Sequence, residues 1–257
     1  MTTHVPAGNI AGMVFSLAVA WGMPAALFFL LYKKKDAKVL TFFLGCGSFF
    51  LFAMVLEQLL HMLVLLKLGS VSEMLKANLW LYALYGGLAA GLFEETGRFL
   101  TMKYFMKTSS GREDALMYGA GHGGMEAVLV LGIPSINNLV SAVLLNSGKF
   151  LSSLADDSNA QQVLERLSPL WTLPAWQFFL GGVERILAIC LHVALSLLVY
   201  RAVKEKRRWY LYPCAILLHA ALNMVVVLIA NHGSLVLAEL ATLAGTVAVG
   251  ALAWRYV

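Results

Sequence analysis

The chain has 257 residues, of which 60% are hydrophobic and 13% are charged, whereas soluble domains carry about 25% charged residues. This composition excludes a soluble globular protein and indicates an all-α, polytopic membrane protein. The net charge of +5 does not indicate a nucleic-acid partner, because most basic residues lie in short loops, where they set membrane orientation.

Apolar stretches of about 20 residues predict helices that cross the bilayer. The first begins near Asn9 without a preceding basic segment or cleavage site, so we expect it to be retained rather than removed as a signal peptide. The cysteines are isolated within predicted spans, which argues against a disulfide framework. We predict one integral membrane domain, residues 1–257, with about seven transmembrane helices: 9–32, 39–66, 79–102, 115–136, 174–200, 209–230 and 235–254.

The distribution of lysine and arginine predicts the orientation of these spans. The loops after the first, third and fifth spans and the C-terminal tail contain thirteen, and the loops on the opposite side contain four. This places the N-terminus outside and the C-terminus in the cytosol. The outer loop, residues 137–173, contains an apolar run at Leu139–Leu154, which would form an interfacial helix or an ordinary loop helix, and a predicted helix at Gln161–Leu167.

Ionisable and amide side chains interrupt four of the predicted spans. Glu94, His122, His192 and His219 lie eight to eleven residues from the cytoplasmic ends of their spans, or about 12–17 Å. Charge in hydrocarbon costs about 2.5–3.5 kcal/mol per residue and persists mostly where it serves a site. We therefore expect four helices to direct these groups into one cavity: Glu94, Glu95 and Arg98; His122 and Glu126; Glu184, Arg185 and His192; His219 and Asn223.

Spacing within the helices adds to this expectation. Three pairs are four residues apart and share a helix face: Glu94 with Arg98, His122 with Glu126, and His219 with Asn223. The glycine-rich run at 119–124 would let a neighbouring helix or a substrate backbone approach His122 closely.

Structural roles explain some of these residues better than others. Arg98 can compensate only one of the adjacent carboxylates Glu94 and Glu95, so the other is available as a general base or acid. Packing or hydrogen bonding would account for His61 and His192, and polar pairing for Glu57 and Gln58. Glu184 would form a salt bridge to Arg98 or bond to a neighbouring amide.

The polar layer contains no convincing Ser–His or Cys–His pair, and no span contains Asp, which argues against serine and aspartyl mechanisms. Its carboxylates, imidazoles and amide suit the activation of water for attack on a carbonyl. Glu94 or Glu95 would take the proton, and His122, His219 and Asn223 would bind the oxyanion. In a second variant, His122 and His219 with a carboxylate would bind zinc and leave one coordination position open.

The motifs resemble those of the type II CAAX prenyl protease and bacteriocin-processing superfamily, and more closely its YhfC branch of intramembrane metalloproteases. One spacing differs, because the wider superfamily has three residues between the glutamate doublet and its arginine and this chain has two. That difference rotates the arginine about 100° around the helix. The resemblance rests on spans three to six: Glu94-Glu95-Thr96-Gly97-Arg98, residues 121–126, Glu184-Arg185 with His192, and His219 with Asn223.

The resemblance implies an α-helical core whose site opens toward the cytosolic half of the membrane. It implies proteolysis of a membrane-embedded protein or a lipidated, membrane-anchored peptide in a bacterial cell membrane. By position, Glu94 or Glu95 would activate water, Arg98 would orient the doublet, and His122 would join His219 and Asn223 at metal-binding or oxyanion positions.

The sequence is also compatible with three other classes of function. A non-catalytic membrane scaffold or chaperone would keep the polar core for packing. A proton-coupled transporter would use Glu126, Glu184 and the histidines as a relay. A haem protein would use two of the histidines as axial ligands.

Overall fold

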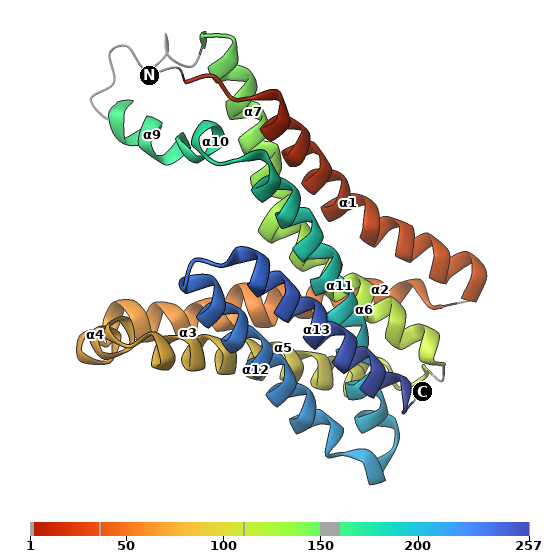
Figure 1. Ribbon diagram of the computed structural model, residues 1–257. Coiled ribbons are helices and arrows are strands. Elements are labelled where there is room, and N and C mark those ends of the chain that lie inside the picture. Colours follow the sequence, from red (N-terminus) through yellow and green to blue (C-terminus); the bar gives the residue numbers. More distant parts are fainter. Residues whose placement is uncertain (1–2, 36, 110, 150–159, 257) are drawn as a thin grey trace. The chain divides into compact units, whose positions relative to one another are not determined.

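The computed structural model describes residues 3–35, 37–109, 111–149 and 160–256. These residues form helices and short connections and contain no β-strand (Figure 1). The α-helices are α1 Ala7–Lys35, α2 Val39–Phe49, α3 Gln58–Met62, α4 Gly69–Ala77, α5 Leu79–Phe105, α6 Arg112–Ala127, α7 Ile133–Asn146, α9 Ala160–Leu167, α10 Pro169–Thr172, α11 Ala175–Lys204, α12 Leu211–Asn231 and α13 Leu235–Trp254. The π-helices are η1 Phe50–Glu57, η2 Leu63–Lys67 and η3 Val128–Gly132, and η4 Lys206–Arg208 is a 3-10 helix.

The all-helical, multi-pass fold predicted from the composition is confirmed. Six helices of the described chain are long and apolar enough to cross a membrane: Ala7–Lys33, Val39–Lys67, Arg112–Asn146, Ala175–Lys204, Lys206–Asn231 and Leu235–Trp254. The seventh expected span corresponds to α5, which has 27 residues but carries Glu94, Glu95 and Arg98 near its middle and is therefore less apolar. The predicted orientation of the spans stays a prediction.

The helix that begins at Arg112 continues beyond the expected end of its span at residue 136. It runs from α6 through η3 into α7 and ends at Asn146, so part of the expected outer loop is helical. The helix predicted at Gln161–Leu167 is present as α9. The end of the apolar run at Leu139–Leu154 lies outside the described residues.

The chain divides into two compact units, which we describe separately. Unit 1 comprises residues 1–23 and 127–186, and unit 2 comprises residues 24–126 and 187–257, so far as the structure describes them. Buried apolar side chains of α5, α6, α11, α12 and α13 form the main core of unit 2. Except for Glu184 and Arg185, all the candidate site residues belong to unit 2. The prediction of one integral membrane domain stays a prediction.

Helix α5 is fixed in unit 2 at its start and along its length. The side chain of Asn78 caps its N-terminus by accepting hydrogen bonds from the N–H groups of Trp80 and Leu81, at 3.0 and 3.2 Å. Further along, Gly87 and Gly91 face the backbone of α12, where a Cβ atom would collide with it. This close approach positions the carboxylates of α5 beside the histidine of α12.

Candidate active site

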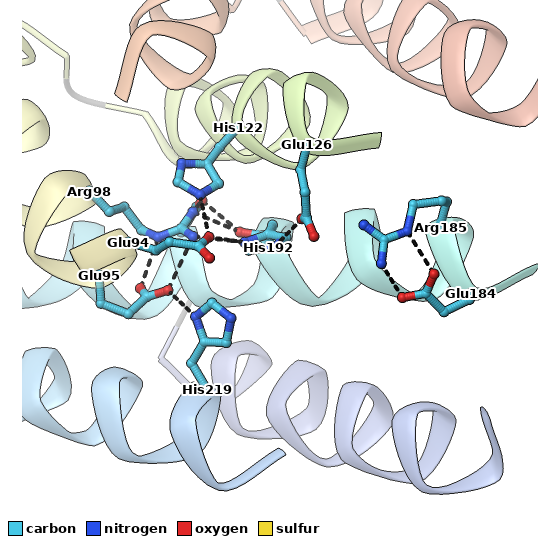
Figure 2. Close-up of polar contacts among 10 residues, drawn as sticks. Glu94, Glu95, Arg98, His122, Glu126, Glu184, Arg185, His192 and His219 are labelled. Atoms are coloured by element: carbon cyan, nitrogen blue, oxygen red, sulfur yellow. Dashed lines mark hydrogen bonds and ion pairs between the residues drawn. The ribbon is translucent and has the colours of Figure 1, made fainter. Parts of the chain in front are cut away.

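Four helices of unit 2 bring ionisable side chains into one buried cluster, as the sequence predicts (Figure 2). Glu95, Arg98 and His122 have no exposed surface, and Glu94 is only 7% exposed. The cluster contains Glu94, Glu95 and Arg98 from α5, His122 and Glu126 from α6, His192 from α11, and His219 from α12.

Glycines explain how α6 comes close enough to contribute its histidine. A Cβ atom on Gly119 would lie 2.6 Å from Cα of Val193, and one on Gly123 would lie 3.0 Å from Cα of Ile189. Both contacts are with the backbone of α11, so larger residues would push the helices apart. The close approach expected from the glycine run is therefore present around His122.

The arginine pairs with a different glutamate from the one expected. Arg98 Nε lies 2.9 Å from Glu95 Oε2, and its Nη2 lies 3.2 Å from Glu95 Oε1. The pairing of Glu94 with Arg98 that the i,i+4 spacing suggested is thus wrong, because the side chains three residues apart meet instead. His219 Nδ1 lies 3.0 Å from Glu95 Oε1, so Glu95 has a cation and an imidazole as partners.

Arg98 also connects α5 to α11. Its Nη1 donates to the backbone oxygen of His192 at 3.1 Å and to the hydroxyl of Ser196, and its Nη2 lies 3.0 Å from His192 Nδ1. Ser196 is fully buried and was not among the predicted site residues. Its position four residues after His192, on the same helix face, was the available signal. Arg98 therefore holds the doublet and the α11 histidine in a fixed arrangement.

Glu94, which has no contact with Arg98 among the hydrogen bonds and ion pairs of the described residues, faces two imidazoles. Its Oε2 lies 3.0 Å from His122 Nε2 and 3.9 Å from His192 Nδ1. The two imidazole rings are 4.9 Å apart, centroid to centroid. His122 also packs against Phe49 in a T-shaped arrangement, with the ring centroids 5.3 Å apart. One carboxylate and two imidazoles thus converge in a buried space.

These three groups fit a divalent metal ion. One potential ligand atom from each of Glu94, His122 and His192 lies within 4.8 Å of the others. The carboxylate of Glu126 lies 2.7 Å from His192 Nε2, which favours a proton on that nitrogen and leaves a lone pair on Nδ1. That lone pair accepts from Arg98 Nη2 at 3.0 Å, and Glu94 Oε2 lies 3.9 Å from the same nitrogen. Two histidines and one glutamate are a donor set that binds zinc with an open position for water.

Four of the predicted residues differ from expectation, one in its role and three in their place. His219, expected as a metal ligand, bonds to Glu95 instead, and His192 takes the place beside His122. Asn223, one turn further along α12, lines a separate cavity described below. Glu184 and Arg185 bond to each other, with 2.8 Å between Arg185 Nε and Glu184 Oε2, and belong to unit 1 (Figure 2).

Comparisons with known proteins identify the family of the chain. The family model described as "YhfC intramembrane metalloprotease" matches residues 17–243. The chain is 41% identical to the "Uncharacterized membrane protein YhfC" of Bacillus subtilis (strain 168) over 216 residues, which are 84% of this chain and 83% of that protein. No solved structure matches. The chain is a multi-pass protein of the bacterial cell membrane, and it belongs to the YhfC intramembrane metalloprotease family.

Proposed function

We propose that the protein is an intramembrane endopeptidase that hydrolyses a peptide bond of a membrane-embedded or membrane-anchored substrate. The observation that carries this proposal is the buried group of Glu94, His122 and His192 beside a second carboxylate that is already neutralised. Such a group has few structural reasons to exist in a bilayer, since packed apolar side chains would stabilise the helices at lower cost.

The three residues would hold zinc, which when bound supplies an acidified water molecule as the nucleophile. Glu94 directs Oε2 toward the two imidazoles, and we assign its second oxygen, Oε1, to accept a proton from water. The carboxylate of Glu126 favours the His192 tautomer with its proton on Nε2. Nδ1 would then bind the metal in place of its present contact with Arg98 Nη2.

The remaining groups of the cluster would bind the carbonyl under attack. His219 is held through Nδ1 by Glu95, and its ring lies 5.3 Å from that of His192, centroid to centroid. Because His219 Nδ1–H donates to the Glu95 carboxylate, Nε2 would donate to the developing oxyanion when the ring is protonated on both nitrogens. Arg98 acts through Glu95 and is a positioning residue, because the guanidinium bonds to protein groups on several sides.

Metal analysis tests the assignment of ligands. Purified wild-type protein should contain one zinc per chain, and His122→Ala and His192→Ala should each lose it. His219→Ala is the matched control, because it removes a buried histidine of the same cluster that bonds to Glu95. Loss of zinc from His219→Ala with retention in His192→Ala would overturn the ligand set.

Proteolysis can be tested without knowledge of the substrate. Bacterial membranes containing either wild type or Glu94→Gln would be compared for new protein N-termini by mass spectrometry. We expect termini within predicted transmembrane segments that appear with the wild type and fall at least about 100-fold with the variant. If both give the same termini while Glu94→Gln is markedly less stable, the cluster serves a scaffold and not a protease.

A further inference from the structure

Unit 2 contains a cavity of about 470 Å³ that the proposed mechanism does not use. It lies between α3, α5 and α12, and its polar lining includes Gln58, His61, Tyr85 and Asn223. We propose that this cavity binds an unwound, extended segment of the polypeptide substrate next to the bond that is cut. This inference rests on the proposed function.

The cavity presents groups that match a bare peptide backbone. Gln58 and Asn223 each offer an amide donor and an amide acceptor. His61 Nε2 lies 3.2 Å from Glu57 Oε1, and His61 Nδ1 lies 2.8 Å from the hydroxyl of Tyr85. With the ring proton facing the carboxylate, the tyrosine hydroxyl donates to the ring, and its oxygen is left to accept from a substrate N–H.

These polar groups would serve an unwound segment better than a helix or a lipid chain. In a helix the backbone N–H and C=O groups already bond to one another, and an acyl chain has no such groups. An extended segment in hydrocarbon leaves each of them unsatisfied, which is strongly unfavourable. Hydrolysis requires an exposed, non-helical peptide bond. A protease in a bilayer therefore needs a site whose polar groups hydrogen-bond to the backbone N–H and C=O groups of the substrate residues beside that bond.

The cavity is also at the right distance from the catalytic groups. Asn223 lies four residues after His219 on α12, and Gly87 lies seven residues before Glu94 on α5. These spacings correspond to about 6 Å and 10 Å along the helices. An extended chain rises about 3.3 Å per residue, so two or three residues reach from the cavity to the reacting bond.

Gly86 gives a direct way to close the cavity. A Cβ atom on Gly86 would have nothing within 4 Å, although the residue lines the cavity, so a leucine there would extend into open space. Gly250 on α13 is a matched control, since a Cβ atom there also meets nothing and the residue does not line this cavity.

Photo-crosslinking in the Glu94→Gln background tests the proposal without any cleavage. The probes are two synthetic transmembrane peptides of about 20 residues, one of leucine and alanine and one with a central Gly-Pro-Gly, in phosphatidylethanolamine and phosphatidylglycerol vesicles. The crosslinker p-benzoylphenylalanine replaces either Tyr82, which lines the cavity, or Trp80, an exposed aromatic on the same helix that does not.

We expect Tyr82→p-benzoylphenylalanine to capture the Gly-Pro-Gly peptide about tenfold more than the other peptide, a factor that corresponds to about 1.4 kcal/mol. Gly86→Leu should abolish this preference, and Gly250→Leu should keep it. Equal capture of both peptides, equal capture from Trp80, or capture of phospholipid alone would overturn the proposal. Crosslinking with the expected pattern in a protein that never cleaves would refute the protease and leave the binding site intact.

Discussion

Replacing the buried Arg98 by methionine tests whether the Glu95–Arg98 ion pair holds the cluster together. The guanidinium has no exposed surface and makes two hydrogen bonds to the Glu95 carboxylate, at 2.9 and 3.2 Å. Arg98→Met leaves that carboxylate buried with His219 as its remaining partner in the cluster. Removing one partner of a buried ion pair costs about 3–5 kcal/mol, because the other charge stays uncompensated. We therefore expect a loss of this size in the free energy of unfolding.

The double variant Glu95→Leu with Arg98→Met removes both charges and should be less destabilised than Arg98→Met alone. Unfolding in mixed micelles with increasing dodecyl sulfate, followed by far-ultraviolet circular dichroism, measures these differences. Arg112→Met is the control, because its ion pair with Glu113 has a 47% exposed arginine side chain and should contribute at most about 1 kcal/mol. An Arg98→Met loss as small as that of the control, or a double variant whose loss equals the sum of the single losses, would refute this reasoning.

Three other predictions concern single positions. Gly121→Ala places a Cβ atom against the backbone of α2 and should destabilise the protein by about 1–3 kcal/mol. Gly47→Ala is the control, because its Cβ atom meets nothing within 4 Å and the substitution should be neutral or stabilising. Thermal unfolding in detergent compares the two variants. Asn78→Ala removes the N-cap of α5 and should cost about 1 kcal/mol in the same unfolding assay, while Asn78→Ser should recover most of it. Glu126→Ala removes the carboxylate beside His192 and should weaken zinc binding about 10–100-fold in a chelator competition, and an unchanged affinity would contradict its orienting role.

The sequence was sufficient to predict the class of fold and the meeting of polar side chains from four helices. Long apolar stretches must be helical in a bilayer, where each backbone polar group needs a partner within its own segment. Polar residues that interrupt such stretches are costly, so Glu94, His122, His192 and His219 could be expected to share an interior site. The glycines beside His122 indicated close helix packing for a similarly local reason, since only small residues let backbones approach.

Tertiary structure alone decided which partner each polar group has. At 100° per residue, positions i+3 and i+4 lie about 60° and 40° on either side of residue i, so both spacings satisfy the same pattern. The spacing therefore allowed Arg98 to pair with either Glu95 or Glu94, and in the structure it pairs with Glu95. Likewise, His192 and not His219 lies with His122 around Glu94. Spacing along one chain fixes the height and face of a side chain on its own helix, but the rotation of each helix and the identity of its neighbours depend on packing between helices.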